Sequence, residues 1–148
     1  MADPTSVTFF GPLDAVVGPW MEYLLLVLAV ATMLTRIVEH DSHRRQAEEG
    51  DDDALSRHPL HVFTLWGLVV ASLYYTTLHM HAGVVLTTLV VGVFLADFFE
   101  FESRKVEVRE GHDLERPKSA VLLSVVALLY AGYLSLFFLV EPYWSAIV

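Results

Sequence analysis

The sequence predicts an all-α membrane protein in which four transmembrane helices form an antiparallel bundle. Its 148 residues are 55% hydrophobic, and their mean hydropathy is +0.51. The apolar residues gather in four runs of about 20, which is the length that crosses a hydrocarbon core of ~30 Å. We therefore expect a single transmembrane domain over residues 1–148, made of four spans and their connections.

The first span is expected over residues 20–38. Gly18 and Pro19 precede it, and proline suits the first turn of a helix because its missing N–H would be unpaired there anyway. The apolar stretch at residues 9–17 is too short to span a bilayer. We expect this stretch to lie in the membrane interface.

The second span is expected over residues 59–78 and the third over residues 82–101. Only residues 79–81 separate them, so the two helices must be antiparallel neighbours. No glycine or proline follows the third apolar run before Gly111. The third helix should therefore project from the membrane into the cytoplasm.

The fourth span is expected over residues 119–140. Pro117 lies just before it and marks the start of a new helix. Tyr143 and Trp144 follow the span, and such aromatic side chains are typical of the membrane–water interface. They predict that the outer end of the fourth helix lies at headgroup level.

The basic residues predict the orientation. All nine fall in two stretches: Arg36, Arg44, Arg45 and Arg57 in the first, and Arg104, Lys105, Arg109, Arg116 and Lys118 in the second. Lys and Arg near span ends are retained on the cytoplasmic side. We therefore expect a multi-pass protein of the plasma membrane with cytoplasmic loops at residues 39–58 and 102–118 and with both termini outside.

The charge balance limits the partners and the host. Acidic residues outnumber basic ones by 18 to 9, and such a surface repels nucleic acid. Crowded carboxylates are tolerable where molar salt shortens the Debye length to about 3 Å, so the composition indicates a halophilic host. The chain has no cysteine, which excludes disulfides, iron–sulfur clusters and thiolate zinc sites.

Small residues at four-residue spacing predict close helix packing. These pairs are Gly67 with Ala71, Gly92 with Ala96, and Ala127 with Ala131. Small side chains let helix backbones approach each other in lipid. The faces are expected to meet inside the bundle or to contact a partner, which would be another membrane protein or a second copy of the chain.

One group of residues could carry chemistry, and it lies at the cytoplasmic end of the predicted bundle. The candidate metal ligands are His40, His43, His58, His61, Asp97 and Glu100. Imidazole and carboxylate groups suit zinc, iron or manganese, and helix bundles build such sites from facing helices. The competing interpretation is an ion pair between Arg36 and Asp97, which lie at nearly the same depth and would satisfy each other without a metal.

Four segments carry a resemblance to a known family: residues 11–14, 56–61, 97–105 and 114–118. They resemble a family of small four-helix integral membrane proteins of haloarchaea. The resemblance covers nearly the whole chain and implies the same topology and the same kind of host. It implies no catalytic residue, because that family has no assigned activity.

The sequence therefore predicts a non-enzymatic integral membrane protein that serves as an accessory or scaffolding subunit, with no cofactor. Two alternatives stay open. One is a metal-binding or haem-binding redox subunit that uses the histidine and carboxylate group. The other is a small channel or transporter, which would need oligomerisation because four helices enclose little room.

Overall fold

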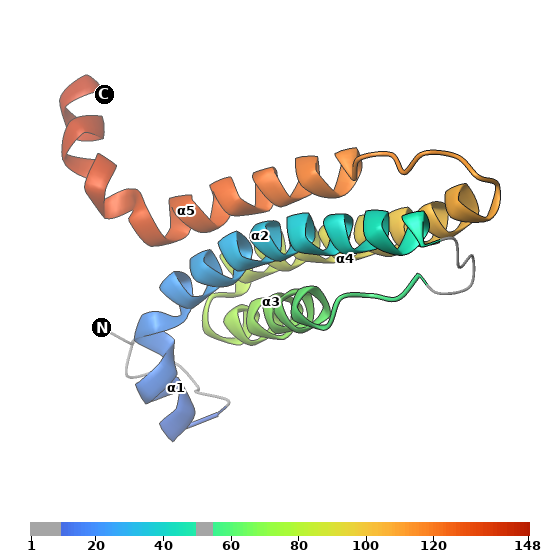
Figure 1. Cartoon of the computed structure of the whole chain (residues 1–148). Coiled ribbons are helices and arrows are strands. Elements are labelled where there is room, and N and C mark those ends of the chain that lie inside the picture. The colour runs from blue at the N-terminus through green and yellow to red at the C-terminus, as the bar shows by residue number, and fades with distance from the viewer. Residues whose placement is uncertain (1–9, 50–54) are drawn as a thin grey trace.

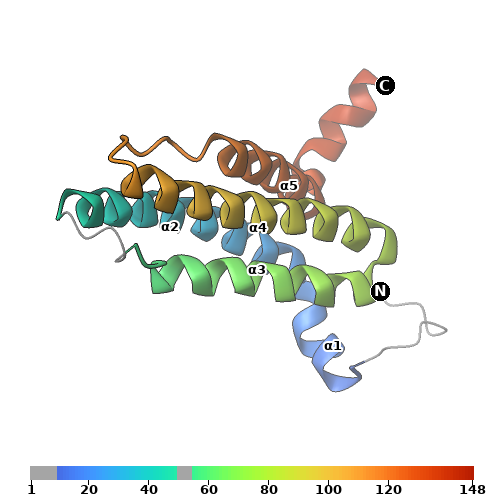
Figure 2. The ribbon, with the colours of Figure 1, turned by 90° about the vertical axis from the view of Figure 1, so that its right-hand side faces the viewer.

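The computed structural model describes residues 10–49 and 55–148, and all regular structure in that part of the chain is helical. Four long helices lie side by side (Figures 1 and 2). They are α2 (Met21–Glu48), α3 (Pro59–Leu78), α4 (Met80–Arg109) and α5 (Lys118–Ile147). All four belong to segments that are long and apolar enough to cross a membrane.

The four long helices form a closed ring of contacts. α2 and α4 each pack against both α3 and α5. The end of α2, the end of α4 and the start of α5 lie at one end of the bundle, which we call the loop end (Figure 1). The turn between α3 and α4 lies at the opposite end, which we call the hairpin end (Figure 2).

Local sequence signals set the helix boundaries at the loop end. Pro59 occupies the first turn of α3, and the His58 Nδ1 accepts a hydrogen bond from the Leu60 N–H at 3.3 Å. Such a side-chain cap satisfies one of the donors that a helix start leaves unpaired. α4 ends ahead of Gly111, whose φ of +75° suits the left-handed residue that closes many helices.

Two helices run well past their predicted spans. α2 continues to Glu48, so the first half of the connection predicted at residues 39–58 is helical. The reason is local, because residues 39–48 contain neither glycine nor proline and are rich in Glu, Arg, Gln and Ala. α4 continues to Arg109, close to the Gly111 at which the sequence predicts its end.

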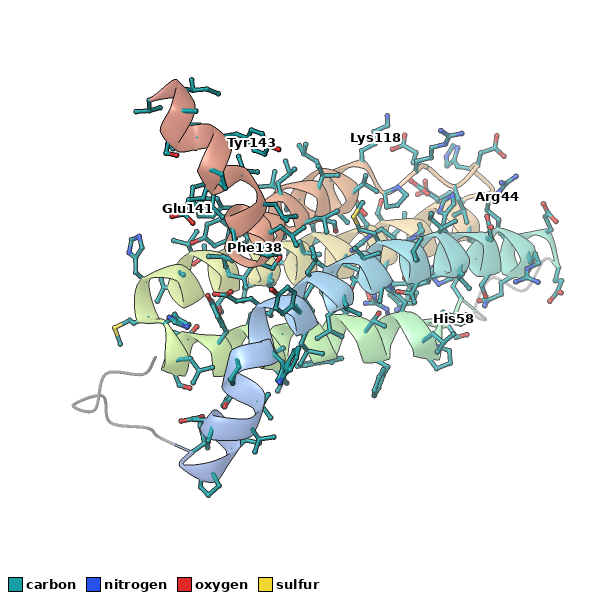
Figure 3. All side chains as sticks on the ribbon, turned by 90° about the vertical axis from the view of Figure 1, so that its left-hand side faces the viewer. Arg44, His58, Lys118, Phe138, Glu141 and Tyr143 are labelled. Carbon is teal, nitrogen blue, oxygen red and sulfur yellow. The ribbon has the colours of Figure 1, made fainter. Side chains whose placement is uncertain are left out.

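Short segments leave the bundle at the hairpin end. The helix α1 (Pro12–Val17) and the 3₁₀ turn η1 (Gly18–Trp20) precede α2 and point away from the bundle axis (Figure 1). The last part of α5 also bends away, carrying Phe138, Glu141 and Tyr143 (Figure 3). Residues 138–148 are exposed throughout, and Pro142 removes one backbone hydrogen bond within them.

The predicted small-residue faces lie mostly inside the bundle. Ala71, Ala127 and Ala131 are buried. A Cβ at Gly67 would contact Leu28 of α2 at 3.5 Å, and one at Gly92 would contact Leu123 of α5 at 3.8 Å. Ala96 is half-buried. These residues therefore allow contact between helices of the same chain.

Candidate functional site

Five ionisable side chains gather at the loop end, and we call them the ionic cluster: Arg36, Glu39, Arg57, His61 and Asp97. Arg36 is 2% exposed, and Glu39, His61 and Asp97 are each 0% exposed. The Arg57 side chain is 24% exposed. Ionisable groups within a span are costly to bury, so they mark a functional or structural site.

Three helices and one extended segment position the cluster. Arg36 and Glu39 lie three residues apart on α2 and therefore share a helix face. His61 lies in the first turn of α3 and Asp97 on α4. Arg57 belongs to the short segment before α3. The side chains thus reach one level of the bundle from separate parts of the chain.

Asp97 holds the cluster together. Its Oδ1 accepts hydrogen bonds from Arg36 Nη1 at 3.1 Å and from His61 Nε2 at 3.0 Å, and its Oδ2 accepts one from Arg57 Nη2. Arg36 also donates from Nη2 to the Ser124 Oγ of α5 at 3.1 Å. The hydrogen bonds of Arg36 and Asp97 therefore join all four long helices.

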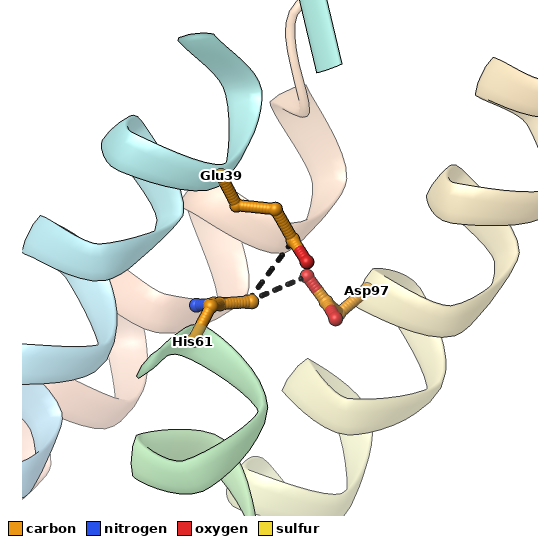
Figure 4. A group of neighbouring side chains, drawn as sticks. All are labelled: Glu39, His61 and Asp97. Atoms are coloured by element: carbon orange, nitrogen blue, oxygen red, sulfur yellow. Dashed lines mark hydrogen bonds and ion pairs between the residues drawn. The ribbon is translucent and has the colours of Figure 1, made fainter. Parts of the chain in front are cut away.

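Glu39 completes the cluster beside the same His61 nitrogen that Asp97 contacts. Its Oε1 accepts hydrogen bonds from the His58 backbone N–H at 3.1 Å and from Arg57 Nε at 3.4 Å. Its Oε2 lies 3.6 Å from His61 Nε2. Figure 4 shows the imidazole facing both carboxylates. Glu39 thereby fixes the start of α3 against α2.

Polar groups surround both ring nitrogens of His61. Its Nε2 faces two carboxylates, which only accept hydrogen bonds, so we assign the ring hydrogen to Nε2. Its Nδ1 lies 3.0 Å from Thr35 Oγ1, which lies 2.9 Å from Thr64 Oγ1. The Thr35 hydroxyl also donates to the Thr32 carbonyl oxygen at 3.1 Å, so both ring nitrogens of His61 lie against hydrogen-bonding partners.

Within the ionic cluster, two arginines face two carboxylates. Arg36 and Arg57 supply two positive charges, and Glu39 and Asp97 supply two negative ones. Balanced charges with several hydrogen bonds are the condition under which ionic groups persist in a low-dielectric interior. The cluster therefore needs no further ion to compensate it.

The other predicted metal ligands have separate partners. His43 Nε2 donates to the Ser56 carbonyl oxygen at 2.9 Å, and His58 caps α3. Glu100 Oε1 accepts hydrogen bonds from the backbone N–H groups of Ser119 and Ala120 at 3.0 and 3.2 Å, which caps α5. His40 is half-buried between α2 and α5. Of the six candidates, the structure brings only His61 and Asp97 together.

The sequence of the whole chain matches one protein family. The matched region covers residues 3–148, and the family is described as a domain of unknown function, DUF7313. The chain belongs to this family. It matches none of the curated proteins and none of the solved structures with which it was compared. The function of this DUF7313 protein must therefore be argued from its own geometry.

Glu39 and Arg57 of this DUF7313 chain lie in the cluster, although they are not among its predicted site residues. The sequence does contain a signal that could place Glu39 in the cluster. Glu39 follows Arg36 by three residues and lies just after the end of the apolar run. Arg57 precedes His61 by four residues, but it lies outside the helix, so helical spacing says nothing about its direction. Its place depends on the path of the segment before α3.

One set of atoms in the DUF7313 chain has the spacing of a metal site. Ligand atoms of Glu39, His61 and Asp97 all lie within 4.8 Å of one another. However, Arg36 and Arg57 already neutralise the two carboxylates, and the further charges within electrostatic range of Arg36, those of Glu100 and Arg104, are of opposite sign. A divalent ion would add two uncompensated positive charges to a dry site. The donor set therefore fits a metal in number but not in charge.

Proposed function

We propose that this chain is a non-enzymatic integral membrane protein that serves as a scaffolding or accessory subunit of a plasma-membrane complex. The observation that carries the proposal is the ionic cluster, whose hydrogen bonds join α2, α3, α4 and α5 through Asp97 and Arg36. Both oxygens of Asp97 already accept hydrogen bonds. Groups used in this way hold helices in one arrangement and leave little capacity for a reaction.

The proposed topology is an antiparallel bundle with a cytoplasmic loop end. One residue, His79, separates α3 from α4, so the chain must reverse there. Basic residues such as Arg44 and Lys118 lie at the loop end, and Tyr143 lies at the other (Figure 3). By the positive-inside rule, this asymmetry supports a cytoplasmic loop end and outer termini.

The proposed host is a halophile, and exposed acids support this. The loop end carries the exposed carboxylates Asp41, Glu48, Glu49, Glu102, Glu110, Asp113 and Glu115. Closely spaced like charges repel each other less where salt screens them. The haloarchaeal resemblance of the sequence agrees with this proposal.

We place the contact with a partner on the loop-end extensions of α2 and α4. The small residues Ala71, Ala127 and Ala131 are used inside the bundle, which leaves them unavailable to another protein. Residues 39–48 and 102–109 continue their helices beyond the apolar windows. These polar helical ends are the part of the described chain that a water-facing partner could reach.

The test is to purify the tagged chain from its native membranes at high salt and to weigh every co-purifying chain. We expect a partner, or a second copy, in a fixed ratio. The double variant Glu48→Lys/Glu102→Lys reverses two exposed charges on the proposed contact and should lower partner recovery several-fold. The control Glu141→Gln changes an exposed carboxylate at the hairpin end and should leave recovery unchanged. Recovery of the chain alone as a monomer would overturn the proposal.

A metal-binding function is the second candidate, because Glu39, His61 and Asp97 converge. Elemental analysis of the purified chain separates the two functions. The scaffold proposal expects no stoichiometric metal. One transition-metal ion per chain that disappears in His61→Gln would make the chain a metalloprotein instead.

A further inference from the structure

The short helix α1 has the polarity of a segment that faces lipid. Asp14 is its one charged residue, and this residue is only 8% exposed. Leu13 and Val16 are 49% and 70% exposed, while Val17 packs against the core of the bundle. The charged side chain therefore turns toward the protein and the most apolar surface turns away from it. A helix on a water-exposed surface shows the opposite arrangement.

Hydrogen bonds hold Asp14 in this position. Its Oδ1 accepts one from the Tyr74 hydroxyl of α3, and its Oδ2 accepts one from the Phe10 backbone N–H at 3.2 Å. The rings of Phe10 and Tyr74 lie 5.5 Å apart between their centroids. Asp14 thus links α1 to α3 and also satisfies a backbone donor just ahead of α1. Backbone polar groups must be satisfied within the protein where lipid replaces water.

α1 lies beside the end of a predicted span and not above it. Tyr74 precedes Leu78, the last residue of α3, by four residues, or about 6 Å along the helix. A Cβ at Gly18, directly after α1, would lie 3.8 Å from the Leu78 Cδ1. Figures 1 and 2 both show α1 turning away from the bundle axis at the hairpin end. The outward face of α1 therefore continues the apolar surface of the spans.

We propose that α1 is embedded in the lipid leaflet at the hairpin end, with Leu13 and Val16 among the acyl chains and Asp14 as the positioning residue. A location in the interface, as the sequence predicts, does not say which face of this segment meets lipid. Lipid is the occupant that fits, because the exposed residues in the range 10–17 are all apolar: Phe10, Pro12, Leu13, Ala15 and Val16. The proposal rests on the membrane placement of the bundle and not on its scaffolding function.

Spin labels measure the lipid contact directly, because the chain has no cysteine of its own. Val16→Cys, Val27→Cys and His112→Cys are each labelled with a nitroxide in the full chain and reconstituted in phosphatidylcholine liposomes. Oxygen concentrates in lipid, whereas a nickel chelate stays in water. Val27, 63% exposed on α2, gives the lipid reference, and His112, exposed at the loop end, gives the water reference. We expect the Val16 label to collide more often with oxygen than with the nickel chelate, as the Val27 label does.

The contrary outcomes are distinct. A Val16 label that meets the nickel chelate as often as the His112 label does would overturn the lipid contact of α1. Spin–spin broadening between Val16 labels would also overturn it, because a second copy of the chain would then cover this face. A Val27 label that reads water would overturn the membrane placement as well. None of these results depends on whether the chain has a protein partner.

The positioning role of Asp14 is tested in the labelled Val16→Cys chain. Tyr74→Phe removes the hydroxyl that bonds Asp14, so that α1 should move toward water to hydrate the carboxylate. We expect the ratio of oxygen to nickel accessibility at residue 16 to fall several-fold. Tyr133→Phe removes an exposed hydroxyl from α5 and should leave the ratio unchanged. Circular dichroism checks that both variants are folded, and an equal ratio in the two would overturn this role of Asp14.

Discussion

The stability of the bundle is expected to depend strongly on one side chain, that of Asp97. It is fully buried and accepts hydrogen bonds from Arg36, Arg57 and His61. Removing its charge would leave two guanidinium groups facing only one carboxylate, Glu39. The cost of an unpaired buried charge exceeds the net gain of the original pair.

We therefore expect Asp97→Asn to lower the free energy of unfolding by about 3–5 kcal/mol. The measurement is urea or thermal unfolding in detergent, followed by circular dichroism. The matched control is Glu102→Gln on the same helix, because Glu102 pairs with Lys105 on the surface at 3.0 Å. Exposed pairs contribute about 0–1 kcal/mol. Equal stability of the two variants would show that the cluster does not hold the bundle together.

For single residues, the sequence predicts how deep a side chain lies in the membrane better than it predicts which side chains it contacts. Hydropathy places Arg36, His61 and Asp97 at one membrane level, because it counts residues from the span ends. It cannot tell which neighbour a side chain meets, since that depends on how the helices are rotated about their axes. Arg57 shows the limit, because it enters the cluster from an extended segment that has no periodic pattern.

The hairpin of α3 and α4 depends on a glycine that the spacing of small residues does not single out. A Cβ at Gly83 would lie 2.3 Å from the Thr76 Cα and 2.7 Å from its backbone nitrogen. Those atoms are backbone and cannot move aside as a side chain can. The tight reversal after Leu78 therefore requires the absence of a side chain at this position.

We expect Gly83→Ala to destabilise the protein, because the two helices must separate to admit the methyl group. The control is Gly132→Ala in α5, where an added Cβ meets nothing within 4 Å. That change should stabilise the helix by about 0.5–1 kcal/mol, since alanine loses less backbone entropy than glycine. Melting temperatures in detergent should therefore shift in opposite directions. A shift in the same direction would contradict the close approach.

Helix ends show why some elements were predicted less well than others. The apolar runs locate α3 almost to the residue, because Pro59 and His79 bound it on both sides. The end of α2 at Glu48 lies ten residues past the predicted span. Hydropathy marks the end of the apolar, lipid-facing segment and not the end of the helix. Polar residues that favour helices, such as Glu and Arg, are therefore predicted as loop. Only the lack of a breaker indicates the extension.

At the scale of the molecule, the two ends of the bundle differ in charge. The basic residues Arg44 and Lys118 lie at the loop end, and the exposed aromatic end of α5 lies opposite, with Tyr143 (Figure 3). A difference of this kind gives a multi-pass protein a preferred orientation during insertion.

The orientation can be measured directly because the chain has no cysteine. Single cysteines at Ser145 and His112, both exposed, report the two ends after treatment with a membrane-impermeant maleimide. We expect Ser145→Cys to react in intact cells and His112→Cys to react only after lysis, since positive residues hold the loop end inside. The natural chain serves as the unlabelled control. The reverse pattern would contradict the proposed cytoplasmic loop end.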